Sequence, residues 1–216
     1  SKRHDVVIST KFGVNWTKGV NDKWAKTFYD CSPKRVVEAL EASLRRLRLD
    51  SIPLYYIHWP DPGTPFKQTA EALQRCQEAG KIQKIGLSNF PLSMIQEISK
   101  DIKISAVQAQ YSLIDREVED RFLHVCKDLD IAVFTYGPLA QGFLSGKYNR
   151  GSKFDDTDCR SRLSHFKADE FQRHQDVINK IHEISKRYDI TMSQVALRWV
   201  IENPNISSMI SGIKTV

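Results

Sequence analysis

Residues 80–90, with the sequence GKIQKIGLSNF, contain the pattern that decides the fold. Gly80 follows a segment of helical period at residues 69–79, and glycine commonly ends a helix. Residues 82–87 are mainly apolar, as expected of a strand whose two faces are both covered. Polar residues at 88 and 89 then end the strand. This order of helix, short connection and buried strand indicates a parallel β/α arrangement.

Similar patterns continue on both sides. Further apolar runs predict strands over residues 5–10, 53–57, 104–110, 131–136 and 207–211. Between the first two of these, Ser32 is a suitable N-cap and Pro33 stands in the first turn of a helix that continues to Leu47. Thr191 is the expected N-cap of the last of the later helices, which are predicted over residues 69–79, 117–129, 170–188 and 193–202.

Strands that alternate with helices through short connections are typical of a parallel sheet under helices. The predicted fold class is therefore α/β, as a (β/α)8 TIM barrel with about six of the eight strands present. An open doubly wound sheet has the same alternation, but no GxGxxG motif follows the first strand, which disfavours a Rossmann arrangement. Since no linker or repeat divides the chain, we expect residues 1–216 to form a single barrel domain.

The composition limits the function classes. The net charge is +6, but the basic residues are scattered, so nucleic-acid binding is not expected, whereas a polyanionic small molecule is compatible with this charge. No apolar run is long enough to predict a membrane span, and the polar residues at the start of the sequence do not fit a signal peptide. The oligomeric state is left open. The widely spaced cysteines fit neither zinc nor a disulfide framework and favour a cytoplasmic protein; they are Cys31, Cys76, Cys126 and Cys159.

Polar residues stand where the predicted strands end, which is where the reacting groups of a parallel barrel lie. They include Lys11, His58, Ser88, Asn89, Gln108, Tyr136, Gly212 and Lys214. Each alone has an ordinary structural explanation, because a lone histidine at a strand end is more often a satisfied structural group than a catalyst. Their coincidence at one end of the sheet favours a functional site.

These residue types suit hydride transfer to a carbonyl group. A carbonyl that receives hydride develops negative charge on oxygen and needs a proton donor and a polar or positive neighbourhood. His58 can donate a hydrogen bond to that oxygen, and Lys11 can supply positive charge. Asn89 and Gln108 can bond a carboxamide, while the ring of Tyr136 can stack on a nicotinamide. Glycines close to a lysine suit a diphosphate, here Gly142, Gly146 and Lys147.

Several motifs occur in a fixed order along the chain. They are Ser9-Thr10-Lys11, Ile57-His58-Trp59-Pro60-Asp61, Gly80-Lys81-Ile82 with Ile85-Gly86-Leu87-Ser88-Asn89-Phe90, Gln108-Ala109-Gln110-Tyr111, the segment 136–147 and Ser211-Gly212-Ile213-Lys214. This series resembles the aldo-keto reductase family over nearly the whole length, and most closely its bacterial and potassium-channel β-subunit-like branch.

The resemblance implies a barrel that binds NADPH without a Rossmann domain and transfers hydride to an aldehyde or ketone. Lys11 and His58 would be the catalytic pair, and a cation at Lys214 would favour NADPH over NADH. The residues implied to bind the cofactor are Ser88, Asn89, Gln108, Tyr136, Gly137, Pro138, Leu139, Gln141, Gly142, Gly146, Lys147, Gly212 and Lys214.

The family pattern also includes parts that these residues do not supply. Its general acid is a tyrosine, paired with an aspartate, on a two-strand segment that would precede Ser1, and a tail would follow Gly212. We therefore expect a longer parent chain. Tyr29 and Tyr56 are favoured as packing residues rather than as replacement acids. The sequence has Arg48 and Pro53 where the family usually has Gly and Asp, and both are departures from its pattern.

Two functions remain open. One is an NADPH-dependent oxidoreductase that reduces an aldehyde or ketone to an alcohol. The other is a catalytically inactive cofactor-binding partner or sensor subunit, which a true start at Ser1 would favour because the tyrosine and aspartate would then be absent. Substrate specificity is expected in loops 15–31 and 152–165, where aromatic residues suit either packing or ring stacking: Trp16, Trp24, Phe28 and Tyr29.

Overall fold

The computed structural model describes residues 5–17 and 26–212, and the chain forms two compact units. The first unit comprises residues 1–108 and 128–132, and the second comprises residues 109–127 and 133–216. Within the described residues, no helix is both long enough and apolar enough to cross a membrane. Trp24 and Lys214 lie outside the described part of the chain.

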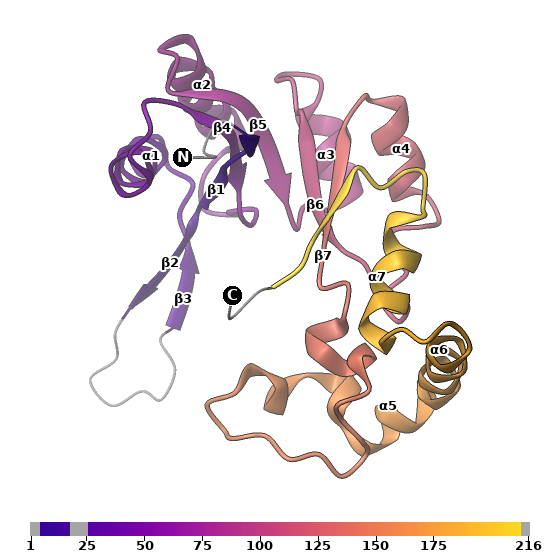
Figure 1. Cartoon of the computed structure of the whole chain (residues 1–216). Helices are drawn as coiled ribbons and strands as arrows, with labels where there is room; N and C mark the ends of the chain where they lie inside the picture. The colour runs from indigo at the N-terminus through magenta and orange to yellow at the C-terminus, as the bar shows by residue number, and fades with distance from the viewer. Residues whose placement is uncertain (1–4, 18–25, 213–216) are drawn as a thin grey trace. The chain divides into compact units, whose positions relative to one another are not determined.

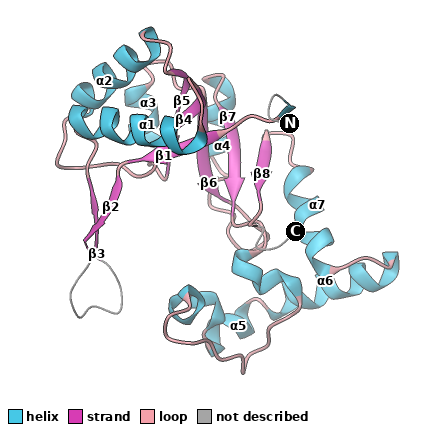
Figure 2. Ribbon diagram, turned by 60° about the vertical axis from the view of Figure 1, so that its left-hand side comes forward, coloured by secondary structure: helices cyan, strands magenta, loops and turns pink. Residues whose placement is uncertain are grey.

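The first unit is a parallel sheet with helices packed on it. Its strands follow one another in the order β1 (Ser9–Phe12), β4 (Ile52–Ile57), β5 (Ile82–Ser88) and β6 (Ala106–Gln110). Figure 2 shows beside them the helices α1 (Pro33–Leu47), α2 (Phe66–Glu78) and α3 (Leu92–Ile98). The Tyr55 hydroxyl of β4 donates a hydrogen bond to the Val36 carbonyl of α1 at 3.4 Å, so this face of β4 packs on α1.

The strand register brings one row of residues onto the other face of that sheet. Lys11 of β1 pairs with Tyr56 of β4, Tyr56 pairs with Gly86 of β5, and Gly86 pairs with Ala106 of β6. Successive side chains of a strand point to opposite faces. Because Tyr55 points to α1, its neighbour Tyr56 and the row to which it belongs face away from that helix.

A β-hairpin follows β1. Its strands β2 (Val14–Thr17) and β3 (Lys26–Tyr29) pair antiparallel, and Figure 1 shows it projecting from the sheet of the first unit. Residues 15–31 are expected from the sequence to form a loop, and that expectation is wrong for both strands. Each has only four residues, and although Val14–Thr17 alternates between apolar and polar side chains, a run of this length is a weak strand signal. At the end of β3, the Asp30 N–H donates a hydrogen bond to the Gly13 carbonyl at 3.0 Å.

The second unit combines two parallel strands with helices. β7 (Ala132–Tyr136), which begins in the first unit, pairs in parallel with β8 (Ser208–Ile210). The α-helices are α4 (Phe122–Asp128), α5 (Ala168–Arg173), α6 (Gln175–Tyr188) and α7 (Met192–Ile201). Three short 3-10 segments are η2 (Ala140–Ser145), η3 (Cys159–Arg162) and η4 (Ser164–Phe166).

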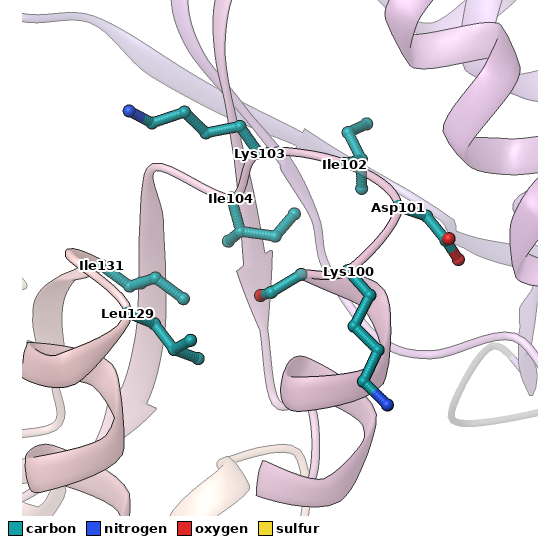
Figure 3. A pocket seen from close by; sticks show the side chains of 8 residues that line it. Lys100, Asp101, Ile102, Lys103, Ile104, Leu129 and Ile131 are labelled. Atoms are coloured by element: carbon teal, nitrogen blue, oxygen red, sulfur yellow. The ribbon is translucent and has the colours of Figure 1, made fainter.

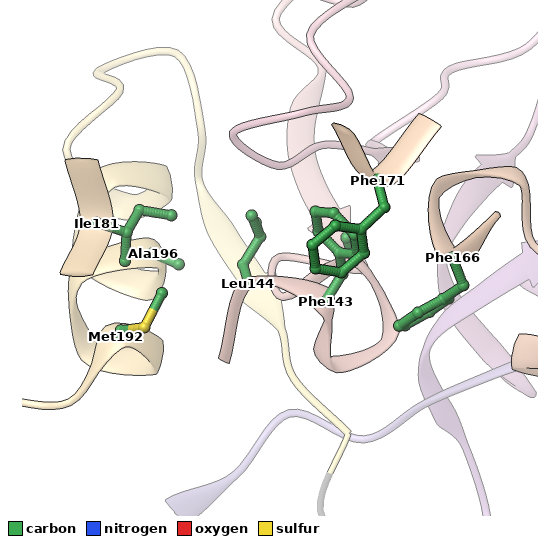
Figure 4. Packing of buried hydrophobic residues seen from close by; sticks show 8 residues of the cluster. Phe143, Leu144, Phe166, Phe171, Ile181, Met192 and Ala196 are labelled. Carbon is green, nitrogen blue, oxygen red and sulfur yellow. The ribbon is translucent and has the colours of Figure 1, made fainter. Parts of the chain in front are cut away.

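Phe143 occupies the centre of the core of the second unit (Figure 4). It is fully buried, and the rings of Phe166 and Phe171 meet it edge to face with centroids 5.6 and 4.9 Å away. Ala196 and Met192 of α7 belong to the same cluster. Edge-to-face aromatic pairs add to the stabilisation that burial alone gives, and these two pairs join η2 to η4 and α5.

The predicted fold class is confirmed by parallel strands that alternate with helices, and all six predicted strands occur with shifted ends. The single helix predicted over residues 170–188 is wrong, because it breaks at His174 into α5 and α6. The helix predicted from residue 117 begins only at Phe122, and α3 was not predicted. That the whole chain is one domain remains an expectation.

Backbone capping explains several helix ends. The Ser32 hydroxyl accepts a hydrogen bond from the Arg35 N–H, and Thr191 forms a capping box with Gln194, as their sequence positions predict. Arg48, which stands where the aldo-keto reductase pattern has glycine, adopts the left-handed conformation with φ of 53°. A residue without a Cβ is favoured in that region, which explains the usual glycine.

Candidate active site

The two candidate catalytic residues lie on neighbouring strands. Lys11 is in β1, and His58 follows the last residue of β4. The His58 backbone N–H donates a hydrogen bond to the Phe12 carbonyl at 2.8 Å, which fixes the two strand ends to each other. The Lys11 Nζ lies 5.9 Å from the centre of the Tyr56 ring. The sheet therefore brings Lys11 and His58 to one end of one unit.

The protonation of this pair follows from burial and charge. Burial lowers the pKa of Lys11. Burial also lowers the pKa of His58, and the nearby positive charge of Lys11 lowers it further. His58 is therefore neutral near pH 7, and a neutral imidazole has one N–H to donate.

Asn89 links His58 to two other candidate residues. Its Nδ2 donates hydrogen bonds to the His58 carbonyl at 3.0 Å and to the Ser88 Oγ at 3.1 Å, and its N–H donates to the Gln108 carbonyl at 3.2 Å. Asn89 has φ of 62°, a conformation that asparagine tolerates better than most residues. Ser88 and Gln108 are buried register partners on β5 and β6. Lys11, His58, Ser88, Asn89 and Gln108 thus gather within the first unit.

Tyr56 packs as the sequence analysis expects, but its hydroxyl is polar and buried. Its ring crosses Gly86, where an added Cβ would lie 2.4 Å from the Tyr56 Cδ1 and Cε1. Among the described residues the hydroxyl has no hydrogen-bond partner of acceptable geometry. Burial raises the pKa of Tyr56 to about 12, although the Gln108 side chain lies close enough to oppose part of that rise.

Asp61 fixes the loop that carries His58, a role that the sequence analysis missed. Its carboxylate accepts hydrogen bonds from the N–H groups of Cys31 and Gly63, each at 2.8 Å, and from the Thr64 hydroxyl at 2.7 Å. The Asp-Pro-Gly sequence at residues 61–63 is a turn signal from which the local contacts could have been found. The contact to Cys31 spans thirty residues and carries no such signal.

The cavity of about 300 Å³ in Figure 3 lies away from these residues. Its lining comes from the connections that precede β6 and β7, the amino ends of those strands, and consists of residues 99–104, Leu129 and Ile131. A cavity of about 170 Å³ lies beside Asp61 and is lined in part by Cys31, Thr69 and Phe90. Only the second cavity is close to the carboxyl end of β4.

The remaining candidate residues belong to the second unit. Tyr136 ends β7 and is half-buried, and burial raises its pKa. Segment 137–147 turns tightly, with hydrogen bonds from the Ala140 N–H to the Gly137 carbonyl and from the Gly142 N–H to the Leu139 carbonyl. The other candidates of this unit are Pro138, Gln141, Gly146, Lys147 and Gly212.

Glycine at position 146 is required by the local geometry. Gly146 has φ of 77°, and an added Cβ would lie 2.4 Å from the Met192 Sδ. Gly142 has φ of 96° and lies against Tyr148. The glycines of this segment therefore have a structural reason, and their suitability for a diphosphate stays a prediction.

Comparison with known proteins gives a consistent result. The aldo/keto reductase family model matches residues 1–216. Aldo-keto reductase YhdN of Bacillus subtilis is 32% identical over 214 residues, which cover 99% of this chain and 63% of that protein. The NADH-specific methylglyoxal reductase of Escherichia coli is 32% identical over 219 residues, which cover 97% of this chain and 66% of that enzyme.

Two solved structures also match this chain. The glycerol dehydrogenase of Gluconobacter oxydans matches with a TM-score of 0.84 and 31% identity, over 93% of this chain and 61% of that one. An aldo-keto reductase of Bacillus halodurans in its holo form matches with a TM-score of 0.75 and 25% identity. The match covers 98% of this chain and 64% of that one. These structural relatives are TIM barrels, as the sequence analysis predicts. The chain thus spans less than two thirds of the length of these relatives.

Proposed function

Because this chain belongs to the aldo/keto reductase family, we propose that the protein is an NADP-dependent oxidoreductase that reduces an aldehyde or ketone to an alcohol. The observation that carries the proposal is the hydrogen-bonded set at one end of the first unit. There Asn89 joins the His58 loop to Ser88 and to the strand of Gln108, while Lys11 stands on the adjacent strand.

The described residues fit a nicotinamide cofactor. Ser88 and Gln108 place a hydroxyl and an amide side by side in a buried position, which suits the donor and acceptor groups of a carboxamide. The Tyr56 hydroxyl, which lacks a hydrogen-bond partner among the described residues, belongs to the same face of the sheet. We assign the carboxamide to Ser88, Asn89 and Gln108. When bound, the cofactor supplies the hydride.

The second unit is proposed to hold the rest of the cofactor. Tyr136 would stack on the nicotinamide ring, and segment 137–147 and Gly212 would hold the diphosphate and the adjoining groups. Lys214 would contact the ribose phosphate, which favours NADPH. One relative, from Schizosaccharomyces pombe, is named an aldo-keto reductase with NADP(+), and the Escherichia coli relative is named NADH-specific. The choice between the two cofactors is therefore part of the test.

The two candidate catalytic residues have separate tasks. Neutral His58 donates a hydrogen bond to the carbonyl oxygen of the substrate and orients it for hydride transfer. Lys11 brings positive charge toward the same oxygen, where negative charge develops. Both effects are stronger at a site from which water is excluded. The proton donor that the family pattern places on a tyrosine has no counterpart among the residues assigned here.

The proposed substrate is a small carbonyl compound, without a nucleic-acid or membrane partner, and the proposed location is the cytoplasm. The four cysteines are free and three are buried, which suits a reducing compartment. The names of the relatives suggest methylglyoxal and the carbonyl compounds formed by oxidation of glycerol as first substrates.

Titration of the full chain with NADPH and NADH, followed by cofactor fluorescence, tests the cofactor assignment. Oxidation of the bound cofactor by methylglyoxal then tests the reaction. We expect tighter binding of NADPH and a rate that Lys11→Met and His58→Gln each reduce at least about a hundredfold. Binding without turnover for any carbonyl compound would favour the sensor-subunit alternative, and absence of binding would reject both functions.

A further inference from the structure

The Tyr56 hydroxyl has no task in the chemistry proposed above. Tyr56 has no exposed surface, and its oxygen has no well-formed hydrogen bond within the described residues. An unpaired buried hydroxyl destabilises a protein, since it has lost its hydrogen bonds to water. A phenylalanine at this position would avoid that cost. The hydroxyl therefore points to a function beyond packing.

The surroundings of Tyr56 consist of candidate site residues. On the β1 side, Lys11 places its ammonium 5.9 Å from the ring centre. On the β5 side, the ring lies over Gly86, where the absence of a Cβ leaves the space open. Beyond Gly86 is β6, in which Gln108 lies two residues after Ala106, the partner of Gly86. The ring thus extends from Lys11 toward Gln108.

Gln108 is the side chain in reach of the hydroxyl. It is 3% exposed, and its amide lies close enough to offset part of the rise that burial causes in the pKa of the Tyr56 phenol. The distance or angle between the Tyr56 hydroxyl and the Gln108 amide does not meet the criteria for a hydrogen bond. A rotation of the Gln108 amide is the smallest change that would satisfy both groups.

We propose that Tyr56 is a positioning residue of the cofactor site, whose hydroxyl holds the Gln108 amide in the orientation that binds the nicotinamide carboxamide. The assignment rests on the proposed function, because it requires the carboxamide to lie at Gln108. An amide side chain has a donor end and an acceptor end. A hydroxyl fixed beside it selects which end faces the ligand, and so lowers the entropy that is lost on binding.

The neighbouring tyrosine provides a matched control. Tyr55→Phe is the same substitution one residue earlier, on the face that packs against α1, where its hydroxyl bonds to Val36. We expect Tyr56→Phe to raise the dissociation constant of NADPH about three- to tenfold, while the melting temperature is maintained or raised because an unpaired buried hydroxyl is removed. Tyr55→Phe should leave that dissociation constant within twofold and lower the melting temperature instead.

A double-mutant cycle separates positioning from a general effect on the fold. If Tyr56 acts through Gln108, then Tyr56→Phe should weaken NADPH binding no further in a Gln108→Ala background. The reduced 3-acetylpyridine analogue of NADP, which lacks the amide donor, should lose less affinity than NADPH when Tyr56 is changed to Phe. A purely structural role would not discriminate between the two cofactors.

The outcomes are distinct. Equal NADPH affinity of Tyr56→Phe and the wild type overturns the assignment, as does an effect that adds in full to that of Gln108→Ala. Failure of the wild type itself to bind NADPH rejects the proposed function, and the assignment with it, and is recognised before any variant is compared. The assignment is supported if Tyr56→Phe weakens NADPH binding in the protein that retains Gln108 and does not weaken it further in the Gln108→Ala variant.

Discussion

The carboxylate of Asp61 accepts a hydrogen bond from the backbone N–H of Cys31 at 2.8 Å, although the two residues are thirty positions apart. Cys31 lies between the β2–β3 hairpin and α1, and Asp61 lies in the loop after β4. The Cys31 carbonyl in turn accepts a hydrogen bond from the Thr69 hydroxyl of α2 at 2.8 Å. Two connections of the first unit and helix α2 therefore meet at this point, three residues after His58.

Asp61→Asn should destabilise the protein. The substitution keeps the shape of the side chain but replaces an acceptor oxygen by a donor, so one of the N–H or hydroxyl donors loses its partner. We expect the free energy of unfolding to fall by about 1–3 kcal/mol, measured by urea denaturation. Asp50→Asn, at an exposed position of the same unit, is the control and should change it by less than about 0.5 kcal/mol. Equal effects would contradict a special role for Asp61.

The same contacts predict a response to acid. Burial acts to raise the pKa of Asp61, but hydrogen bonds from Cys31, Thr64 and Gly63 outweigh it and hold that pKa below its usual 3.8. Because the folded-state pKa is lowered, the stabilisation is present above the unfolded-state pKa and is lost as the pH falls through the folded-state value. Between about pH 5 and pH 2 the wild type should lose more stability than Asp61→Asn. Parallel losses in urea titrations at each pH would show that the carboxylate is not responsible.

Lys11→Met should raise the pKa of His58. The positive charge of Lys11 contributes to lowering that pKa, in addition to burial, so removal of the charge leaves only the effect of burial. The imidazole pKa can be followed by NMR through the proton shifts of the ring. Lys84→Met, an exposed lysine of β5, is the control and should leave it unchanged. An unaltered His58 pKa in Lys11→Met would mean that the two groups are too far apart to interact.

Gly86→Ala should destabilise the first unit by overpacking. The new methyl would lie 2.4 Å from the Tyr56 ring, so the ring or the strand must shift, at a cost of about 1–3 kcal/mol. The penalty should be smaller in a Tyr56→Leu background, since that residue lacks the ring atoms involved. Unfolding free energies of the four proteins in this cycle measure the coupling, and strictly additive values would contradict the contact.

Phe143→Ala should destabilise the second unit. Phe143 is fully buried and contacts the rings of Phe166 and Phe171, so its truncation leaves a cavity and removes the aromatic contacts. The expected loss is about 3–5 kcal/mol. Tyr188→Ala, with 65% of the tyrosine exposed, is the control and should cost well under 1 kcal/mol. Differential scanning calorimetry of both variants tests the contrast.

The sequence predicts those parts of this fold that have local causes. Apolar runs identify the six parallel strands because both faces of such strands are covered, and Ser32 and Thr191 mark helix starts because their side chains satisfy free N–H groups. Where the signal was weak, as in the short hairpin strands, the prediction failed. The break at His174 was missed because helical periodicity continues across it.

The candidate site shows the same division. The position of Lys11, His58, Ser88, Asn89 and Gln108 at strand ends can be read from the sequence, since parallel strands bring their carboxyl ends to one edge. The strand register cannot be read from the sequence in this way, because it depends on which residues of separate strands pair. Only the tertiary structure aligns Tyr56 with Gly86 and places its hydroxyl near Gln108, and only the tertiary structure joins Asp61 to Cys31. Contacts between residues far apart in the chain are set by packing, and no local pattern records them.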